Sequence, residues 1–256
     1  MLPTVVVIAH TFASRPDLAS VGIPSAEVWP EYNLHGDVLN RLWGPLCDEL
    51  PAFQAVLVEK VSGPSQNVLA EIHTGPLSWD GHDDHLPTGI DDALEQVVSG
   101  SRAGHPTDTL CALAAEVSPH ARGRGLAEIA LRAMADIARE HGYQRLIAPV
   151  RPSHKERYPL TPIERYVTWQ REDGYSRDPW IRVHQRIGGR VATPLPRSLR
   201  ISGTVAEWED WTGMAFPESA EYVFPHGLAT VRIDRDSDVG LYYEPNVWVV
   251  HDLVNR

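Results

Sequence analysis

Two adjoining stretches decide the fold: LCALAAEV at residues 110–117 and SPHARGRGLA at residues 118–127. The first is a short apolar run typical of a buried strand, and the second is a glycine-containing loop that leads into a helix. One helical face is then marked by apolar residues at the recurring spacing of three and four, namely Leu126, Ile129, Ala130, Ala133, Met134, Ile137 and Ala138. His141 and Gly142 are typical of a helix end, so the order is strand, loop and helix.

The loop has the composition of an anion site. The first N–H groups of a helix lack partners within the helix, and the helix dipole places partial positive charge there. Gly123 and Gly125 would let an anion approach the backbone, and Arg122 and Arg124 add full charges. A turn that needs glycine only for its backbone torsions remains an alternative. The sequence has neither the Lys-Ser/Thr pair of a P-loop nor the three-glycine spacing of a Rossmann motif.

The pattern Val117-x-Pro119-x-x-Arg122-Gly123-x-Gly125-x-Ala127 resembles the acyl-CoA signature of the GNAT superfamily of N-acyltransferases. The core of that signature, Arg/Gln-x-x-Gly-x-Gly/Ala, is matched here by Arg122, Gly125 and Ala127. The resemblance implies an α/β fold with a central mixed sheet flanked by helices. It also implies that acetyl-CoA or another acyl-CoA is the cosubstrate. The resemblance further implies that the preceding strand splays from its neighbour to admit the pantetheine arm. The implied CoA-binding residues are Val117, Arg122, Gly123, Arg124, Gly125, Leu126 and Ala127.

Further elements are predicted on both sides of this unit. Strands are expected at 4–9, 53–59, 67–73 and 145–150, and helices at 38–46, 91–98, 163–169 and 180–189. The strands at 53–59 and 67–73 form a hairpin about residues 63–65, and 145–150 runs parallel to the central strand. Strands are also expected at 199–205, 229–233 and 246–250. We therefore expect one domain over 1–256, with a core to about residue 190 and a strand-rich extension at 191–256.

Composition restricts the partners. Lys and Arg number 23 against 34 Asp and Glu, a formal charge of −11 that disfavours nucleic acid and anionic membranes and suits a cationic acceptor. No apolar run approaches the roughly 20 residues of a membrane-spanning helix, and a cytoplasmic location is expected. The two cysteines are expected to be buried, and the His/Asp run at 81–85 is expected to be a solvated loop rather than a metal site. No metal is expected, and a homo-oligomer is left open.

Catalytic residues are implied by the resemblance. The segment 180–189 resembles the family's last core helix, whose tyrosine protonates the departing CoA thiolate; His184 takes the tyrosine position, and Gly189 departs from the usual aromatic residue. An imidazole can act as an acid near neutral pH. Glu116 is the candidate base, because a carboxylate in an apolar strand is costly unless it is paired or functional. The alternative for His184 is a plain helix residue, and the alternatives for Glu116 are a salt bridge or an outward-facing strand position. A water chain could replace either group.

The acceptor wall and the function follow from the same resemblance. The segment 27–37 corresponds to one wall of the acceptor pocket in GNAT proteins, with Trp29, Tyr32 and His35 as candidate contacts; a packed surface loop is the alternative. The backbone N–H of Val117 is expected to polarise the thioester carbonyl. The sequence predicts an N-acyltransferase, most simply an acetyltransferase, that acts on an amine of a small molecule or peptide. A catalytically silent acyl-CoA sensor is the competing interpretation.

Overall fold

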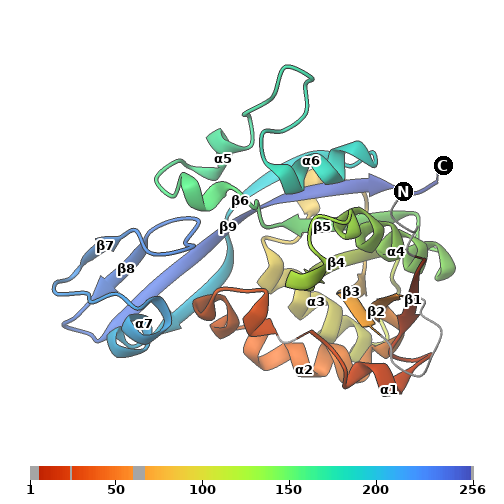
Figure 1. Ribbon diagram of the computed structural model, residues 1–256, viewed down its shortest axis with the longest axis horizontal. Coiled ribbons are helices and arrows are strands. Elements are labelled where there is room, and N and C mark those ends of the chain that lie inside the picture. The colour runs from red at the N-terminus through yellow and green to blue at the C-terminus, as the bar shows by residue number, and fades with distance from the viewer. Residues whose placement is uncertain (1–5, 24, 60–66, 255–256) are drawn as a thin grey trace.

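The computed structural model describes residues 6–23, 25–59 and 67–254, and its centre is a nine-stranded mixed sheet (Figure 1). The strand order is β1-β2-β3-β4-β5-β9-β8-β7, with β6 paired to β9. The strands are β1 Val7–Thr11, β2 Gln54–Glu59, β3 Asn67–Leu77, β4 Thr109–Val117, β5 Arg145–Val150, β6 Arg190–Gly203, β7 Ala220–Tyr222, β8 Val231–Asp234 and β9 Val239–Asp252. The pair β4–β5 is parallel, whereas the pairs on either side of it, β3–β4 and β5–β9, are antiparallel.

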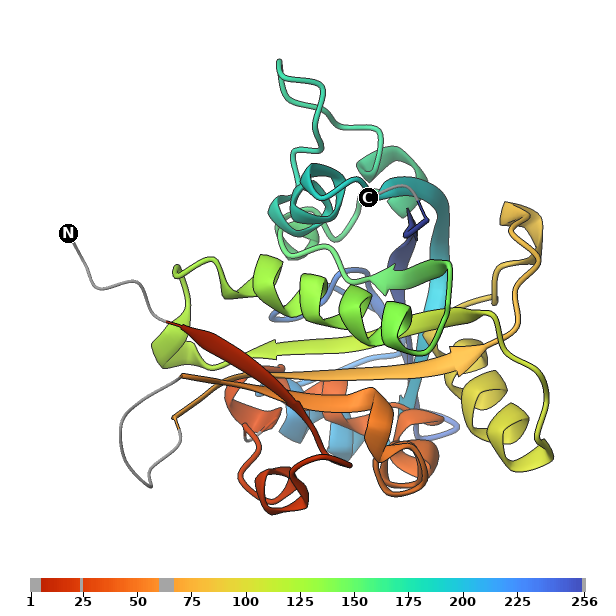
Figure 2. The ribbon, with the colours of Figure 1, turned by 90° about the vertical axis from the view of Figure 1, so that its right-hand side faces the viewer.

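Helices cover both faces of the sheet (Figure 2). The α-helices are α1 Pro16–Ala19, α2 Leu39–Glu49, α3 Ile90–Ala103, α4 Leu126–Glu140, α5 Ile163–Tyr166, α6 Pro179–Arg186 and α7 Val205–Thr212. Short 3₁₀ turns include η1 Ser25–Glu27, η2 Glu31–His35, η3 Pro51–Phe53, η4 Asp83–His85, η5 Pro119–Ala121 and η6 Lys155–Arg157. Helices α4 and α6 lie on one face, and α2 and α3 lie on the other. Within the described ranges, no helix is both long and apolar enough to cross a bilayer.

The predicted strand, loop and helix at the centre are confirmed as β4, η5 and α4. The buried face of α4 differs in detail from the prediction. Ile129 is 36% exposed, while Leu131 and Ala135 are buried beside Met134 and Ile137. The reason is that α4 lies across the sheet with its apolar face rotated by about one residue from the expected one. The predicted hairpin is confirmed as β2–β3; its turn, and residues 4–5 of the first predicted strand, lie outside the described residues.

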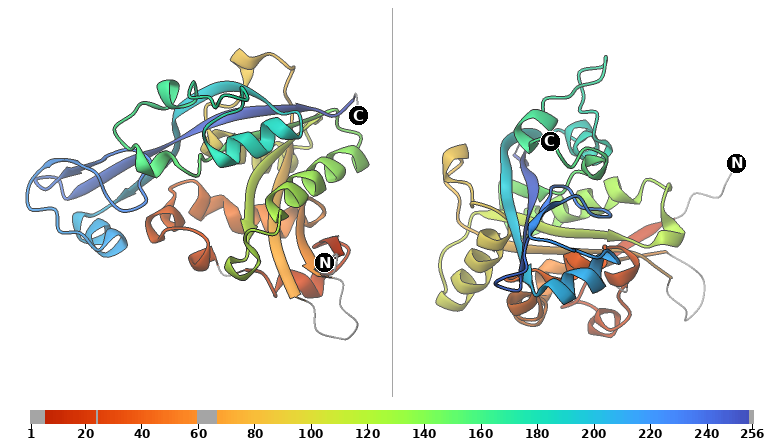
Figure 3. Two further views of the ribbon diagram at one scale, coloured as in Figure 1. Left: turned by 45° about the horizontal axis from the view of Figure 1, so that its top comes forward. Right: turned by 90° about the vertical axis from the view of Figure 1, so that its left-hand side faces the viewer.

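The C-terminal segment is built into the sheet rather than added beside it. Strand β5 pairs along its whole length with the end of β9, from Arg145 opposite Asp252 to Val150 opposite Val247. Strands β6 and β9 have 14 residues each and continue together beyond the main sheet (Figure 3). The expected strand at 246–250 lies within β9, and residues 199–203 of the expected strand at 199–205 lie within β6. The strand ends two residues earlier than expected, because Thr204 is the N-cap of α7 and Val205 is its first residue.

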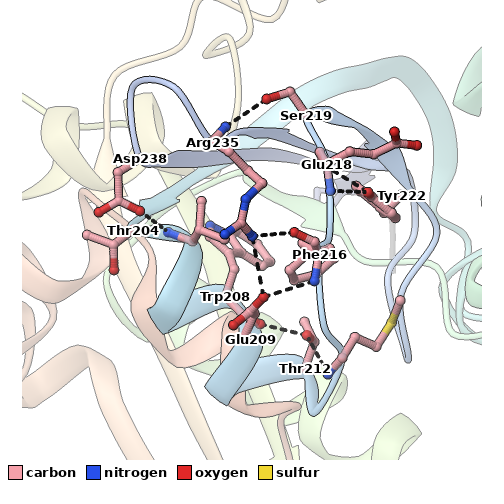
Figure 4. Close-up of polar contacts among 12 residues, drawn as sticks. Thr204, Trp208, Glu209, Thr212, Phe216, Glu218, Ser219, Tyr222, Arg235 and Asp238 are labelled. Carbon is pink, nitrogen blue, oxygen red and sulfur yellow. Dashed lines mark hydrogen bonds and ion pairs between the residues drawn. The ribbon is translucent and has the colours of Figure 1, made fainter.

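The far end of β6 and β9 carries a second hydrophobic core with α7, which the sequence did not predict. Thr204 and Glu207 form a capping box at the start of α7, and Asp238 accepts a hydrogen bond from the Val205 N–H at 3.1 Å (Figure 4). This core contains Tyr32, Leu199, Ile201, Val205, Trp208, Phe216, Phe224, Val231, Ile233 and Tyr242. Several aromatic residues of the C-terminal part are thus core residues and lie away from the opening between β4 and β5.

Candidate active site

The central sheet opens between its two parallel strands. Strands β4 and β5 pair only through Thr109–Arg145, Leu110–Leu146 and Cys111–Ile147, and no pairing follows these rows. A cavity of about 540 Å³ occupies the opening and is lined by residues 112–117 of β4 and 148–151. Leu131 and Met134 of α4 contribute to it from one face of the sheet, and Leu39 and Trp43 of α2 contribute from the other. The cavity therefore connects the two faces through the sheet.

Backbone donors of β4 face this opening. The Ser118 N–H bonds to the Leu69 carbonyl on the β3 side at 3.0 Å, so the alternation of a strand directs the Val117 N–H toward the β5 side. The register with β3 shifts at His73 and Thr74, which pair with Ala114 and Ala112 and leave Leu113 as an extra residue. Such bulges re-aim groups beside active sites. The bulge depends on pairing with β3, so nothing in the sequence pattern marks it.

The glycine loop leads directly into the N-terminus of α4. Gly123 and Gly125 have φ of 78° and 75°, a left-handed conformation that favours glycine, and a Cβ added at either would have no described atom within 4 Å beyond its chain neighbours. Gly125 is the N-cap of α4 and, having no side chain, supplies no capping hydrogen bond; among the described residues, no side-chain bond to the first N–H groups of the helix is seen. Arg122 is exposed, while Arg124 forms an ion pair with Glu59 at 3.3 Å. The loop thus offers backbone donors and the charge of Arg122 to an anion; Glu59 offsets the charge of Arg124.

Glu116 lies where two cavities meet. Its side chain is 3% exposed and accepts a hydrogen bond of 2.5 Å from the Trp29 indole N–H. Glu116 and Trp43 line both the central cavity and a second cavity of about 360 Å³ that also includes Glu71 and His73. A buried carboxylate at the junction of two cavities is positioned to receive a proton from a bound amine.

Of the three expected acceptor contacts, only Trp29 lines a cavity. Tyr32 is 1% exposed in the second core, where its hydroxyl donates to the His226 carbonyl at 2.8 Å. His35 stacks on Trp211 with ring centroids 4.2 Å apart and pairs with Glu31. Neither residue lines the two cavities, because η2 turns its other side, with Asn33 and Leu34, toward the opening.

His184 lines the central cavity from α6, but its environment differs from the one expected. It is 1% exposed, and its Nδ1 lies 2.9 Å from the Nε2 of His251 on β9. Burial, together with the charge of His251, lowers the pKa of His184 well below 6.5. The expected protonated fraction near neutral pH is therefore not supported, because a buried imidazolium beside a second imidazole is disfavoured. The Nε2 of His184 is buried and has no hydrogen-bond partner within the described ranges.

The acceptor side of the cavity contains polar groups that the sequence reasoning missed. Arg151 pairs with Glu244 at 2.9 Å, and Glu244 also accepts from the Asn33 side chain at 3.0 Å. Asn246 is 3% exposed and lines the cavity, and its side chain has no hydrogen bond to any described residue. One signal could have identified these residues. Glu244 and Asn246 occupy alternate positions, between Tyr242 and Trp248, in a strand that is otherwise apolar on that face.

Other ionisable residues give no sign of a metal site. Over the described ranges, no group of three or more His, Cys, Asp or Glu side chains is arranged to hold a metal ion. Residues 83–85 of the His/Asp run form an exposed 3₁₀ turn, in which His85 pairs with Asp80. Cys111 is buried, and its burial raises the pKa of the thiol. Cys47 is half-buried and lies 3.7 Å from the His73 ring nitrogen.

Comparisons with known proteins agree with this geometry. The family model described as the acetyltransferase (GNAT) family matches residues 77–160, which include β4, the glycine loop and α4. The chain is 32% identical over 273 residues to the arginine N-acetyltransferase avaD of Aspergillus versicolor, covering 95% of this chain and 93% of that protein.

Solved structures show the same fold. The loading GNATL domain of CurA from Lyngbya majuscula aligns with a TM-score of 0.58 and 16% identity, covering 98% of this chain and 99% of that one. The GphF GNAT-like decarboxylase in complex with isobutyryl-CoA aligns with a TM-score of 0.55 and 16% identity, covering 97% and 99%. The splayed strands, the loop and these relatives together lead to one conclusion: the chain belongs to the GNAT acetyltransferase family and is an acyl-CoA-dependent N-acyltransferase.

Proposed function

We propose that the protein transfers an acetyl group from acetyl-CoA to an amine nitrogen of arginine or of a close relative of arginine. The similarity to an arginine N-acetyltransferase along almost the whole chain supports this acceptor class. The competing idea of a silent acyl-CoA sensor is not favoured, because that relative is itself named as an acetyltransferase. We also propose that the transferred group is acetyl rather than a longer acyl chain, and that the protein is cytoplasmic.

The face of the sheet that carries α4 and α6 suits the cosubstrate. The N-terminus of α4 offers backbone donors for the CoA pyrophosphate, and Arg122 is exposed beside them. From this loop the opening between β4 and β5 leads to His184, whose buried Nε2 has no hydrogen-bond partner among the residues described. An orphaned polar atom inside a cavity is a place where a ligand group completes the hydrogen bonding. These features fit a thioester carried on a long pantetheine arm.

The opposite face, covered by α2 and η2, suits a zwitterionic acceptor. Glu116 and Glu71 supply buried carboxylates for a cationic group, and both line the second cavity. A guanidinium stays charged at any ordinary pH, so it can be bound by carboxylates but does not itself become a neutral nucleophile. Arg151 and the Asn246 side chain supply donors for an anionic or carbonyl group of the acceptor. The acceptor side therefore offers complementary groups to each part of an amino acid such as arginine.

The transfer of an acetyl group to an amine requires few protein side chains. The nitrogen of a neutral amine attacks the thioester carbon, a C–N bond forms, and the C–S bond breaks with its electron pair on sulfur. In our proposal, Glu116 receives the proton that the amine loses. Backbone N–H groups of β4 that face the opening polarise the thioester carbonyl oxygen. The donor expected from the family resemblance is the Val117 N–H. The bulge at Leu113 is a second position on the same strand where a backbone N–H could donate.

The observation that carries the proposal is the position of Glu116, which lines both the central cavity and the second cavity that includes Glu71. The test is CoA release from acetyl-CoA with a panel of amines: L-arginine, agmatine, L-ornithine, L-lysine and an arylalkylamine, with mass spectrometry of the products. We expect acetylation of arginine or another guanidino amine in preference to the arylalkylamine. Preference for the arylalkylamine, or no acetylation of any amine, would overturn the proposed acceptor class.

A further inference from the structure

Two histidines from distant parts of the chain form a buried pair beside the central cavity. His184 is on α6 and is 1% exposed, and His251 is on β9 and is 4% exposed. The Nδ1 of His184 and the Nε2 of His251 are 2.9 Å apart, a hydrogen-bond distance. Trp180 packs edge-on against the His184 ring with centroids 4.5 Å apart, so the ring is held on a second side.

Gly189 shows how closely this pair is packed. A side chain added at Gly189 would place its Cβ 2.6 Å from Cε1 of His251 and 2.9 Å from the His184 carbonyl oxygen. Real Cβ atoms do not approach other atoms that closely, and here the backbone oxygen of α6 cannot move aside as a flexible side chain could. The φ of Gly189 is not in the left-handed region, so glycine is needed at this position for space. Gly189 thus leaves room for His251 to reach His184.

The electrostatics of the pair favour a neutral His184 ring. Burial lowers the pKa of His184 well below 6.5, and a charge on His251 lowers it further. Among the described residues, His251 is the titratable group whose charge acts on this pKa. A neutral His184 ring has one N–H and one lone pair, so its hydrogen bond with His251 uses either the proton or the lone pair of Nδ1. The tautomer of His184 is therefore fixed by whether His251 donates or accepts.

We infer that His251 is a positioning residue that donates its Nε2–H to Nδ1 of His184, which fixes the remaining N–H of His184 at Nε2. This inference rests on the proposed placement of the thioester in the central cavity. The buried Nε2–H, which lacks a partner among the described residues, then donates a hydrogen bond to the CoA sulfur as the C–S bond breaks. His184 stays neutral and keeps its proton throughout. The proton that the amine gives to Glu116 is passed on to the departing CoA sulfur, which leaves as the thiol, so Glu116 ends ionised as it began. The pair replaces a general acid with a fixed hydrogen-bond donor.

The test begins with the tautomer, which does not depend on the acceptor. Long-range ¹H–¹⁵N spectra of the His184 ring should show the Nε2–H tautomer, uncharged at pH 7, and its Nε2 signal should shift when CoA is added. The His251→Phe variant keeps the ring volume but removes the donor, whereas His251→Gln can still donate. We expect His251→Phe to lower kcat about ten- to hundredfold with little change in the KM for acetyl-CoA, and His251→Gln to retain most of the activity.

A matched control separates positioning from packing. Val250→Ala, one residue earlier in β9, removes buried apolar contacts and should lower the Tm while leaving the His184 tautomer and kcat unchanged. The wild-type pH profile should show no fall in kcat between about pH 6.5 and 9, where an imidazolium acid would lose its proton. An Nδ1–H tautomer, a pKa of His184 above 6.5, or a normal kcat in His251→Phe would overturn the inference. If no amine is acetylated but the tautomer is as expected, the proposed function fails and the geometry of the pair stands.

Discussion

Glu116 and Glu71 lie directly opposite each other in the antiparallel pair β3–β4, and both side chains are buried. Glu71 is compensated: one oxygen accepts the Ile23 N–H at 3.0 Å, and the other lies 3.2 Å from the His73 ring. Glu116 accepts a hydrogen bond from the Trp29 indole N–H, among other contacts. Like charges at opposite positions of a sheet destabilise it. Glu116 also lines both cavities, so we propose a functional role for its carboxylate.

The first prediction therefore concerns both activity and stability. Glu116→Gln keeps the acceptor for the Trp29 N–H but removes one of two opposed charges, so the free energy of unfolding should stay equal or rise. The proton acceptor is lost, so kcat/KM for the amine should fall about 100-fold, with acetyl-CoA binding unchanged. Steady-state kinetics and urea unfolding measure the two effects. The matched variant Glu71→Gln should lose stability, because His73 loses its carboxylate; equal kinetics in Glu116→Gln and wild type would remove the proposed base.

A second prediction follows from the pKa of His73. Burial alone lowers this pKa, but hydrogen bonds to Cys47 and Glu71 and the charge of Glu71 outweigh it and raise the pKa to about 9. The stabilisation from protonated His73 is therefore fully present below about pH 6.5, its unfolded value, and is lost as the pH rises through about 9. Urea unfolding should show a loss of about 1–3 kcal/mol between pH 6.5 and 9.5. His73→Gln should largely abolish this slope; an unchanged slope would assign it to other groups.

The third prediction tests the glycine loop. Gly125→Glu would place a carboxylate at the N-cap of α4, where the CoA pyrophosphate is proposed to bind, so calorimetry should show CoA affinity reduced by at least tenfold. Any side chain at this φ of 75° also costs about 1–2 kcal/mol of stability. Gly125→Gln carries the same backbone strain without the charge and is the control. Equal CoA affinity in the two folded variants would show that charge at this loop is irrelevant to binding.

The fourth prediction concerns the acceptor. Asn246→Leu removes an amide that has no hydrogen bond to the described residues, so stability should be unchanged or slightly raised. If the amide binds the acceptor, the KM for that acceptor should rise about tenfold while the KM for acetyl-CoA stays the same. Asn33→Leu serves as the contrast, since it breaks a bond to buried Glu244 and should lower the Tm. An unchanged KM for every amine would place the acceptor elsewhere in the cavity.

The sequence by itself determined the elements around the glycine loop. The apolar run of β4, the paired left-handed glycines and the amphipathic period of α4 are local features, and each depends on neighbours within a few residues. The same locality identified β2, β3 and β5 and singled out Glu116 as a carboxylate in an apolar strand, whereas Trp29 became a candidate through the resemblance to the GNAT family. Propensity and periodicity are sufficient to predict a helix or strand where the element and its exposed face are set by adjacent residues.

Tertiary structure alone decided how the cavity is completed. Whether Tyr32 or Asn33 faces the opening depends on the rotation of η2, which is set by packing against core residues from Leu199 onward in the chain. The pairing of His184 with His251 spans 67 residues and requires β9 to lie beside β5, a contact that no local pattern encodes. The same burial that brings these rings together disfavours the charged form of His184. Its chemistry therefore follows from the environment that the fold creates, and residue type alone could not give it.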